Sequence, residues 1–382
     1  MSNTPLDNFK ATLARYMHFE DSSHVDVCFG TVFANGLDSS PTWLFLVGPP
    51  SSGKTAVLEP ASAHPLLYAL DKLTTQSLVS HHVGKDGKDP SLLPELHRKT
   101  LVIKDFTGMI SMRSQDFHCI LGQLRGAYDG SYASKAGIGG VKRYRNRFGV
   151  IAMVTSAIDK HRPVMTELGE RFVTFRMPDV SPAEARRRGM LLGDRDRRTE
   201  METALREAAY EVLQQPVIEA RMGKAFKNKL WDVAEFVARA RCHIEKHPKT
   251  NEPEIPQPEV PTRLFGQLIN LTKGIAMARG KSKVDGEDAR LVRRTALDSM
   301  TLKRLTLMRA FLDRAHGSLS VGEVAGKMHF PEETIRVHIR DLELLGILQG
   351  SDGLGDSGKV VRKYSLVQKD LLEDLLVSKY VG

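Results

Sequence analysis

The sequence predicts an α/β protein with a parallel sheet, followed by a helical region and a small C-terminal domain. In the first 180 residues, short apolar segments alternate with segments of helical periodicity, which is typical of a parallel sheet covered by helices on both faces. Charged, helix-forming sequence comes next, and the end of the chain combines three short helices with a strand-like segment. We therefore expect three domains, at residues 1–180, 181–299 and 300–382.

The composition narrows the class of protein. Apolar residues make up 41% and charged residues 26% of the chain, which is ordinary for a soluble globular protein. No apolar run reaches 18 residues, so we expect no membrane span. The three cysteines, Cys28, Cys119 and Cys242, are too scattered for a disulfide framework or a four-cysteine zinc site, and they suit a reducing, cytoplasmic compartment. The net charge of +9 weakly favours a nucleic-acid partner.

Each expected element has a sequence signal. Trp43–Val47 is apolar, is followed by glycine and prolines, and predicts the first strand. The other elements expected in the first domain are helices at 9–16, 23–34, 54–58 and 116–128 and strands at 100–103, 148–154 and 171–175. Further helices are expected at 182–214, 224–246, 264–278 and 286–299, interrupted by an extended segment at 247–261 that holds five prolines. We interpret this central part as a helical lid.

The C-terminal domain has the element order of a winged helix-turn-helix. Helices are expected at 302–312, 321–328 and 332–345, and a turn and a strand at 360–366 follow them. Pro331 precedes the third helix and suits its first turn.

A phosphate-binding motif lies between the first strand and the helix expected after it. Gly48 to Thr55 reads G-P-P-S-S-G-K-T and matches G-x-x-x-x-G-K-[ST] at every defined position. Backbone N–H groups of such a loop wrap around phosphates, and a helix N-terminus adds partial positive charge. We expect ATP as the ligand, with Lys54 at its β- and γ-phosphates and Thr55 on Mg²⁺. The expected cofactor-binding residues are Gly48, Pro49, Ser51, Ser52, Gly53, Lys54 and Thr55.

Polar residues also stand at the ends of other expected strands. Asp105 follows the strand at 100–103 and is the expected second anchor for Mg²⁺. Thr155 follows the strand at 148–154, where a polar side chain can reach the γ-phosphate or the attacking water. The hydrolytic base stays open between Glu59, Asp116 and Asp129.

Arg171 stands directly before the last expected strand of the first domain. An arginine at this place can act as an arginine finger, which stabilises charge on the nucleotide of a neighbouring subunit. Arg176, at the end of the same segment, is the alternative.

Taken in order, the phosphate motif, Asp105, Thr155 and Arg171 resemble an AAA+ ATPase over most of the chain. The segments Pro261–Leu264 (P-T-R-L) and Val284–Ala289 (V-D-G-E-D-A) are similar to the lid of the MCM helicases. The chain thus resembles the MCM-like replicative helicases of phages and integrating mobile elements. This resemblance implies that Arg263 is a second sensor, and that a hexameric ring of identical subunits holds single-stranded DNA in its channel.

Two residues depart from the family pattern. Phe106 stands where a glutamate often follows the Mg²⁺-binding aspartate, and Thr155 stands where the family usually has asparagine.

Residues 131–148 are rich in lysine and arginine and contain no acid, and glycines at 137, 139 and 140 predict the tip of a hairpin. The resemblance implies that this hairpin points into the ring channel and grips the DNA backbone. Lys135 and Lys142 are the main candidates, and Arg143 and Arg145 are further ones.

The helix at 332–345 is the expected recognition helix, with Arg336 and Arg340 on its polar face. Residues 301–382 hold 12 basic and 11 acidic residues, so contact with DNA and contact with protein both stay open. The clusters at 186–188 and 195–198 alternate with acids and predict a solvated helical face.

The leading hypothesis is an ATP-driven, ring-forming DNA motor. An ATP-dependent initiator or loader, which assembles on DNA without unwinding it, is the alternative that the missing glutamate favours. A DNA-binding regulator that uses the ATPase fold only to oligomerise is the third, and the intact Lys54, Thr55 and Asp105 argue against it.

Overall fold

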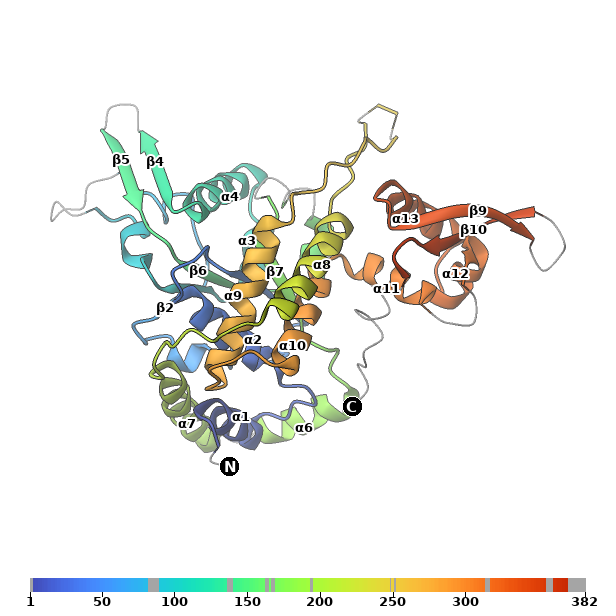
Figure 1. Cartoon of the computed structure of the whole chain (residues 1–382). Coiled ribbons are helices and arrows are strands. Elements are labelled where there is room, and N and C mark those ends of the chain that lie inside the picture. Colours follow the sequence, from blue (N-terminus) through green and yellow to red (C-terminus); the bar gives the residue numbers. More distant parts are fainter. Residues whose placement is uncertain are drawn as a thin grey trace. The chain divides into compact units, whose positions relative to one another are not determined.

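The computed structural model describes residues 3–81, 89–135, 140–161, 165, 169–192, 195–247, 249–250, 252–312, 317–354 and 360–369 (Figure 1). It divides into two compact units. The first unit comprises Met1–Leu230 and Thr262–Thr295, and the second comprises Trp231–Pro261 and Ala296–Gly382. The chain therefore passes between the units three times, and this division differs from the three consecutive domains expected from the sequence.

A five-stranded sheet lies at the centre of the first unit. All its neighbouring strands are parallel, and their order is β2-β3-β6-β1-β7. The strands are β1 (Trp43–Val47), β2 (Leu67–Leu70), β3 (Thr100–Ile103), β6 (Gly149–Val154) and β7 (Phe172–Arg176). The four apolar strands expected from the sequence are present, which confirms an α/β fold with a parallel sheet. Strand β2, which is partly buried, was not expected from the sequence.

Helices cover both faces of the sheet. On one face, α3 (Phe106–Ile110) and α4 (Ser114–Tyr128) contribute to the same apolar cluster as the side chains of β1, β3 and β6. On the other face, α2 (Ser23–Asn35) contacts β1 and β6 and packs along α9 (Thr262–Ala278). These two helices touch through Gly30 and Gly274, since a Cβ on Gly274 would lie 2.0 Å from the carbonyl oxygen of Gly30. Helix α9 thus belongs to the sheet unit, although the sequence suggested a separate helical lid.

Helices outside these layers complete the first unit. They are α1 (Pro5–Tyr16), α6 (Pro182–Leu192), α7 (Arg195–Leu213), most of α10 (Gly286–Asp298) and the start of α8 (Lys224–Ala240). Helix α1 starts before the expected residue 9 because Thr4 and Asp7 form a capping box. Helix α8 ends earlier than expected, where the carbonyls of Ala240 and Cys242 accept hydrogen bonds from Arg304.

The basic segment after α4 forms a hairpin of β4 (Ser131–Lys135) and β5 (Val141–Arg145). It was expected as a hairpin, and its tip at 136–139 lies outside the described residues. In the second unit, the described parts of 247–261 contain no helix, as the prolines predict.

The rest of the second unit has the expected helices and a small antiparallel sheet. The helices are α11 (Leu302–Phe311), α12 (Val321–Met328) and α13 (Glu332–Leu344). The sheet has the order β8-β10-β9, from Leu319–Ser320, Val360–Leu366 and Leu348–Leu354. Within the described parts of both units, no helix combines the length and apolar character needed to cross a membrane.

Candidate functional site

The phosphate motif forms a loop at the carboxyl end of β1, where the backbone N–H of Gly48 donates to the carbonyl of Val154 at 3.1 Å. In open α/β sheets, ligands bind outside the carboxyl ends of the strands, where connections diverge to opposite sides. Strand β1 is such a place, because the chain continues from it to β2 on one side and later adds β7 on the other.

The loop backbone turns through two residues with left-handed φ values. These are Ser51, at 58°, and Gly53, at 86°. Such a conformation favours glycine and strains serine, and backbone strain of this kind is found at ligand-binding loops. Among the described residues, the backbone N–H groups of Gly53, Lys54 and Thr55 donate to no acceptor. Three consecutive donors of this kind suit an anion.

The Lys54 side chain folds back over its own loop. Its Nζ donates to the carbonyls of Gly48 at 2.8 Å and Pro49 at 2.7 Å. Burial lowers the pKa of this ammonium from its ordinary value. A phosphate would replace carbonyl acceptors with a charged one, which is the stronger partner for a desolvated ammonium. The loop N–H groups and Lys54 therefore fit an anion such as a phosphate group.

The helix expected at 54–58 is wrong. Turns follow Thr55, and a short 3₁₀ helix, η1, spans Glu59–Ala61. Pro60 supplies no N–H, so a helix begun at Lys54 could not continue its hydrogen bonds through that residue. The loop therefore lacks the helix N-terminus of the usual motif, and the attraction for phosphate rests on Lys54 and the loop N–H groups.

Asp105 follows β3, which is separated from β1 by β6. Its exposed carboxylate caps α3 by accepting from the N–H of Gly108 at 2.9 Å. Phe106, at the place of the glutamate, is fully buried in the apolar cluster.

Thr155 lies at the end of β6, and its N–H donates to the hydroxyl of Thr107 at 3.0 Å. Thr107 was missed because a lone threonine in a short helix has no sequence signal.

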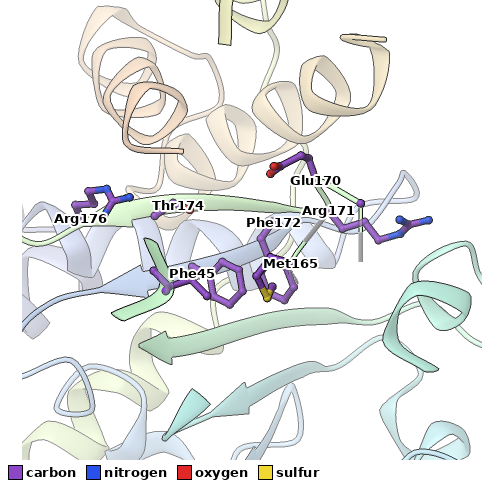
Figure 2. Close-up of a pocket in the computed structure, with 9 residues that line it drawn as sticks. Phe45, Met165, Glu170, Arg171, Phe172, Thr174 and Arg176 are labelled. Atoms are coloured by element: carbon purple, nitrogen blue, oxygen red, sulfur yellow. The ribbon is translucent and has the colours of Figure 1, made fainter. Parts of the chain in front are cut away.

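The two arginines considered as fingers lie at opposite ends of β7 (Figure 2). Arg176 pairs with Val47 of β1 and is therefore at the phosphate-loop edge, where it forms a bidentate ion pair with Asp159. Arg171 precedes the residue that pairs with Trp43, so it lies at the amino-end edge. The two Cα positions are roughly 16 Å apart along the strand. Arg171 therefore lies far from the loop of its own chain.

Arg171 and Arg263 come together at the amino-end edge. Their guanidinium carbons lie 5.3 and 6.0 Å from the centre of the Tyr128 ring. Arg171 also pairs with Asp129 at 3.3 Å, which places that candidate base away from the phosphate loop. Burial and then the neighbouring Arg263 lower the pKa of Arg171. Burial raises the pKa of Tyr128 to about 12.

The contacts of the other two candidate bases do not identify either of them as the hydrolytic base. Glu59 is exposed and lies 3.4 Å from the ammonium of Lys104. Asp116 lies in the first turn of α4. The structure therefore leaves the hydrolytic base open, as the sequence did.

Basic residues of the hairpin divide between its two faces. Lys142 lies on the inner face and binds Asp89 at 2.7 Å and the carbonyl of Ser80 at 2.6 Å. Burial opposes the charge of Asp89, but hydrogen bonds from Lys142, Tyr144 and Ser91 hold its pKa well below the usual range. Lys142 thus joins the hairpin to Ser80 and Asp89, and its expected role as a DNA contact stays a prediction.

The outer face of the hairpin carries Lys135, Arg143 and Arg145, all exposed. Within the described part of the chain, none of the three has an ion-pair partner. We call these three residues the hairpin basic face. They were expected from the sequence, but only the strand register shows that they share a face without Lys142.

The polar face of α13 carries the other expected DNA contacts. Arg336 and Arg340 are exposed, while Ile335, Ile339 and Leu342 are buried. Arg336 lies 3.5 Å from Glu333 and 4.0 Å from Glu332. Acids therefore share this surface, which weakens its attraction for phosphate.

The cluster at 186–188 is solvated only in part. Arg186 and Arg187 are exposed, as expected, but Arg188 is 7% exposed and contacts the phosphate loop. The side chains at 195–197 lie outside the described ones. No group of three or more metal-ligating side chains was found among the described residues.

Comparisons of the chain with protein-family models and with curated proteins found no match, so the function of this site is argued from its residues.

Proposed function

We propose that the protein is an ATP-driven, ring-forming DNA motor, an MCM-like member of the AAA+ ATPases. The observation that carries the proposal is the separation of two charged groups across one sheet. The phosphate loop with Lys54 lies at the carboxyl ends of the strands, and Arg171 with Arg263 lies at their amino ends. Because the two groups lie at opposite ends of the strands, the proposal brings them together across the interface between two copies of the chain.

In this proposal, Lys54 and the loop N–H groups bind the phosphates, and Thr55 and Asp105 hold Mg²⁺. Bound Mg²⁺ neutralises charge on the transferred phosphoryl group. Arg171 and Arg263 of one subunit face the nucleotide of the next, and a closed ring repeats this heterologous contact. The hairpin basic face contacts the phosphates of single-stranded DNA without reading sequence.

An initiator or loader is the second candidate, and two observations favour it. Phe106 is buried where a catalytic glutamate is expected, and the Asp105 carboxylate caps α3. A protein that hydrolyses ATP slowly and assembles on DNA through the winged-helix-like second unit fits these features.

The first experiment measures ATP hydrolysis with and without single-stranded DNA. We expect stimulation by DNA in the wild type and none in Arg171→Ala, followed by strand separation in an unwinding assay. Slow hydrolysis that ignores DNA would favour the initiator, and a wild type that binds no ATP would refute both functions.

A further inference from the structure

Arg188 is a buried cation on a helix whose neighbouring arginines are exposed. Its Nε donates to the carbonyl of His18 at 2.7 Å, and one Nη donates to the carbonyl of Ser52 at 2.9 Å. The other Nη binds Glu184 at 2.5 Å. The guanidinium also lies 4.2 Å from the centre of the Phe19 ring. One side chain thus joins α6, the segment after α1 and the phosphate loop.

The contact with Ser52 fixes one peptide group of the loop. The carbonyl of Ser52 and the N–H of Gly53 belong to the same planar peptide and point in opposite directions. Because Arg188 holds the carbonyl, the N–H of Gly53 points away from Arg188. This N–H is one of the three loop donors for which the described residues supply no acceptor.

Residues of the segment after α1 also pack closely against Gly53. A Cβ on Gly53 would lie 2.7 Å from Phe19 Cζ and 3.0 Å from Met17 Cε. Glu184 strengthens the arrangement, because it accepts from both Arg188 and the N–H of Glu20. Charged hydrogen bonds are strong when buried, so this cluster resists rotation of the peptide.

We propose that Arg188 is a positioning residue for the phosphate loop, which orients the Ser52–Gly53 peptide so that the Gly53 N–H can donate to a bound phosphate. The inference rests on the proposed binding of ATP. It assigns α6 and residues 17–20 a role in nucleotide affinity, although they lie outside the sequence motif.

The test compares Arg188→Lys with Arg186→Lys, the same substitution at an exposed position of the same helix. A lysine keeps the charge but cannot reach His18, Ser52 and Glu184 together. We expect Arg188→Lys to weaken the binding of ATP and ADP about tenfold, and Arg186→Lys to bind like the wild type. Titration calorimetry gives the affinities, and the melting temperature without nucleotide gives the stability.

A purely structural role would lower the melting temperature without weakening the affinity of the folded fraction. Equal affinities of Arg188→Lys and the wild type would overturn the inference. If Arg188→Lys does not fold, Phe19→Leu decides, because it keeps apolar packing but removes the ring beneath the guanidinium. We expect about threefold weaker binding in Phe19→Leu, and unchanged binding there would also overturn the inference. A wild type without nucleotide binding would refute the proposed function as well.

Discussion

The two edges of the central sheet hold their cations differently. At the carboxyl-end edge, Lys54, Arg176 and Arg188 each bind acceptors of their own chain at distances of 2.7–2.9 Å. At the amino-end edge, Arg171 and Arg263 lie side by side around Tyr128, and the ion pair of Arg171 with Asp129 has a length of 3.3 Å. Neighbouring like charges repel, and a shared anion relieves that repulsion. Under the proposed function, the carboxyl-end edge binds the nucleotide, and the amino-end edge of a neighbouring copy faces it.

Mixing two inactive variants tests whether the two edges form one active site between neighbouring copies. We expect Lys54→Ala to lose ATP binding and Arg171→Ala to bind ATP but hydrolyse it about 10³-fold more slowly. A mixture in equal amounts should recover about a quarter of the wild-type rate, because one interface in four combines two intact halves. Steady-state hydrolysis of the mixture measures this recovery.

Arg176→Ala mixed with Lys54→Ala is the matched control. Arg176 lies at the phosphate-loop edge, so we expect no recovery from this mixture. A mixture of Lys54→Ala and Arg171→Ala that is as inactive as its components would place Arg171 outside the active site.

The second prediction concerns burial at the carboxyl-end edge. His24 is fully buried, faces Phe19, and has Asp21, Asp26 and Arg188 around it. Burial lowers its pKa to about 4. The unfolded chain therefore takes up a proton near pH 6.5, and the folded chain does so only near pH 4. Stability falls as the pH drops between these values, by about 3 kcal/mol.

His24→Phe should remove most of this dependence, while the exposed His81→Gln should keep it. Urea unfolding of each variant between pH 7 and pH 4 measures the free energy of unfolding. An unchanged dependence in His24→Phe would show that other groups cause it.

At the amino-end side of the sheet, where the hairpin is joined, the arginines of the hairpin basic face should contribute to DNA binding. Arg143→Ala with Arg145→Ala should weaken single-stranded DNA binding about tenfold at low salt and reduce the salt slope of log K by about 1.4. The charge-matched control, Arg98→Ala with Arg198→Ala, removes two exposed arginines that lie beside acids. Fluorescence anisotropy at several salt concentrations gives the affinity and the salt slope. Equal slopes in the two double variants would show that the hairpin basic face does not contact DNA.

The sequence was most informative where a pattern acts locally. Apolar runs predicted four of the sheet strands, and the spacing of Gly48, Gly53 and Lys54 located the phosphate loop at the end of β1. The helix expected after the loop is absent. The phosphate motif favoured a helix there, and the effect of Pro60 was not considered. The role of Arg188 and the anchoring of Lys142 could not be predicted, because both depend on contacts between residues more than 50 positions apart.

The three passages of the chain between its two units also affect how the protein responds to cleavage. Residues 247–261 connect α8 to α9, and Ile255 is 90% exposed there. A protease that cuts at Ile255 yields two fragments, and each fragment contains part of both units. The nicked protein should therefore migrate as an intact particle under native conditions and separate only after denaturation. No single cut separates the two units from each other, because each unit is built from two segments of the chain.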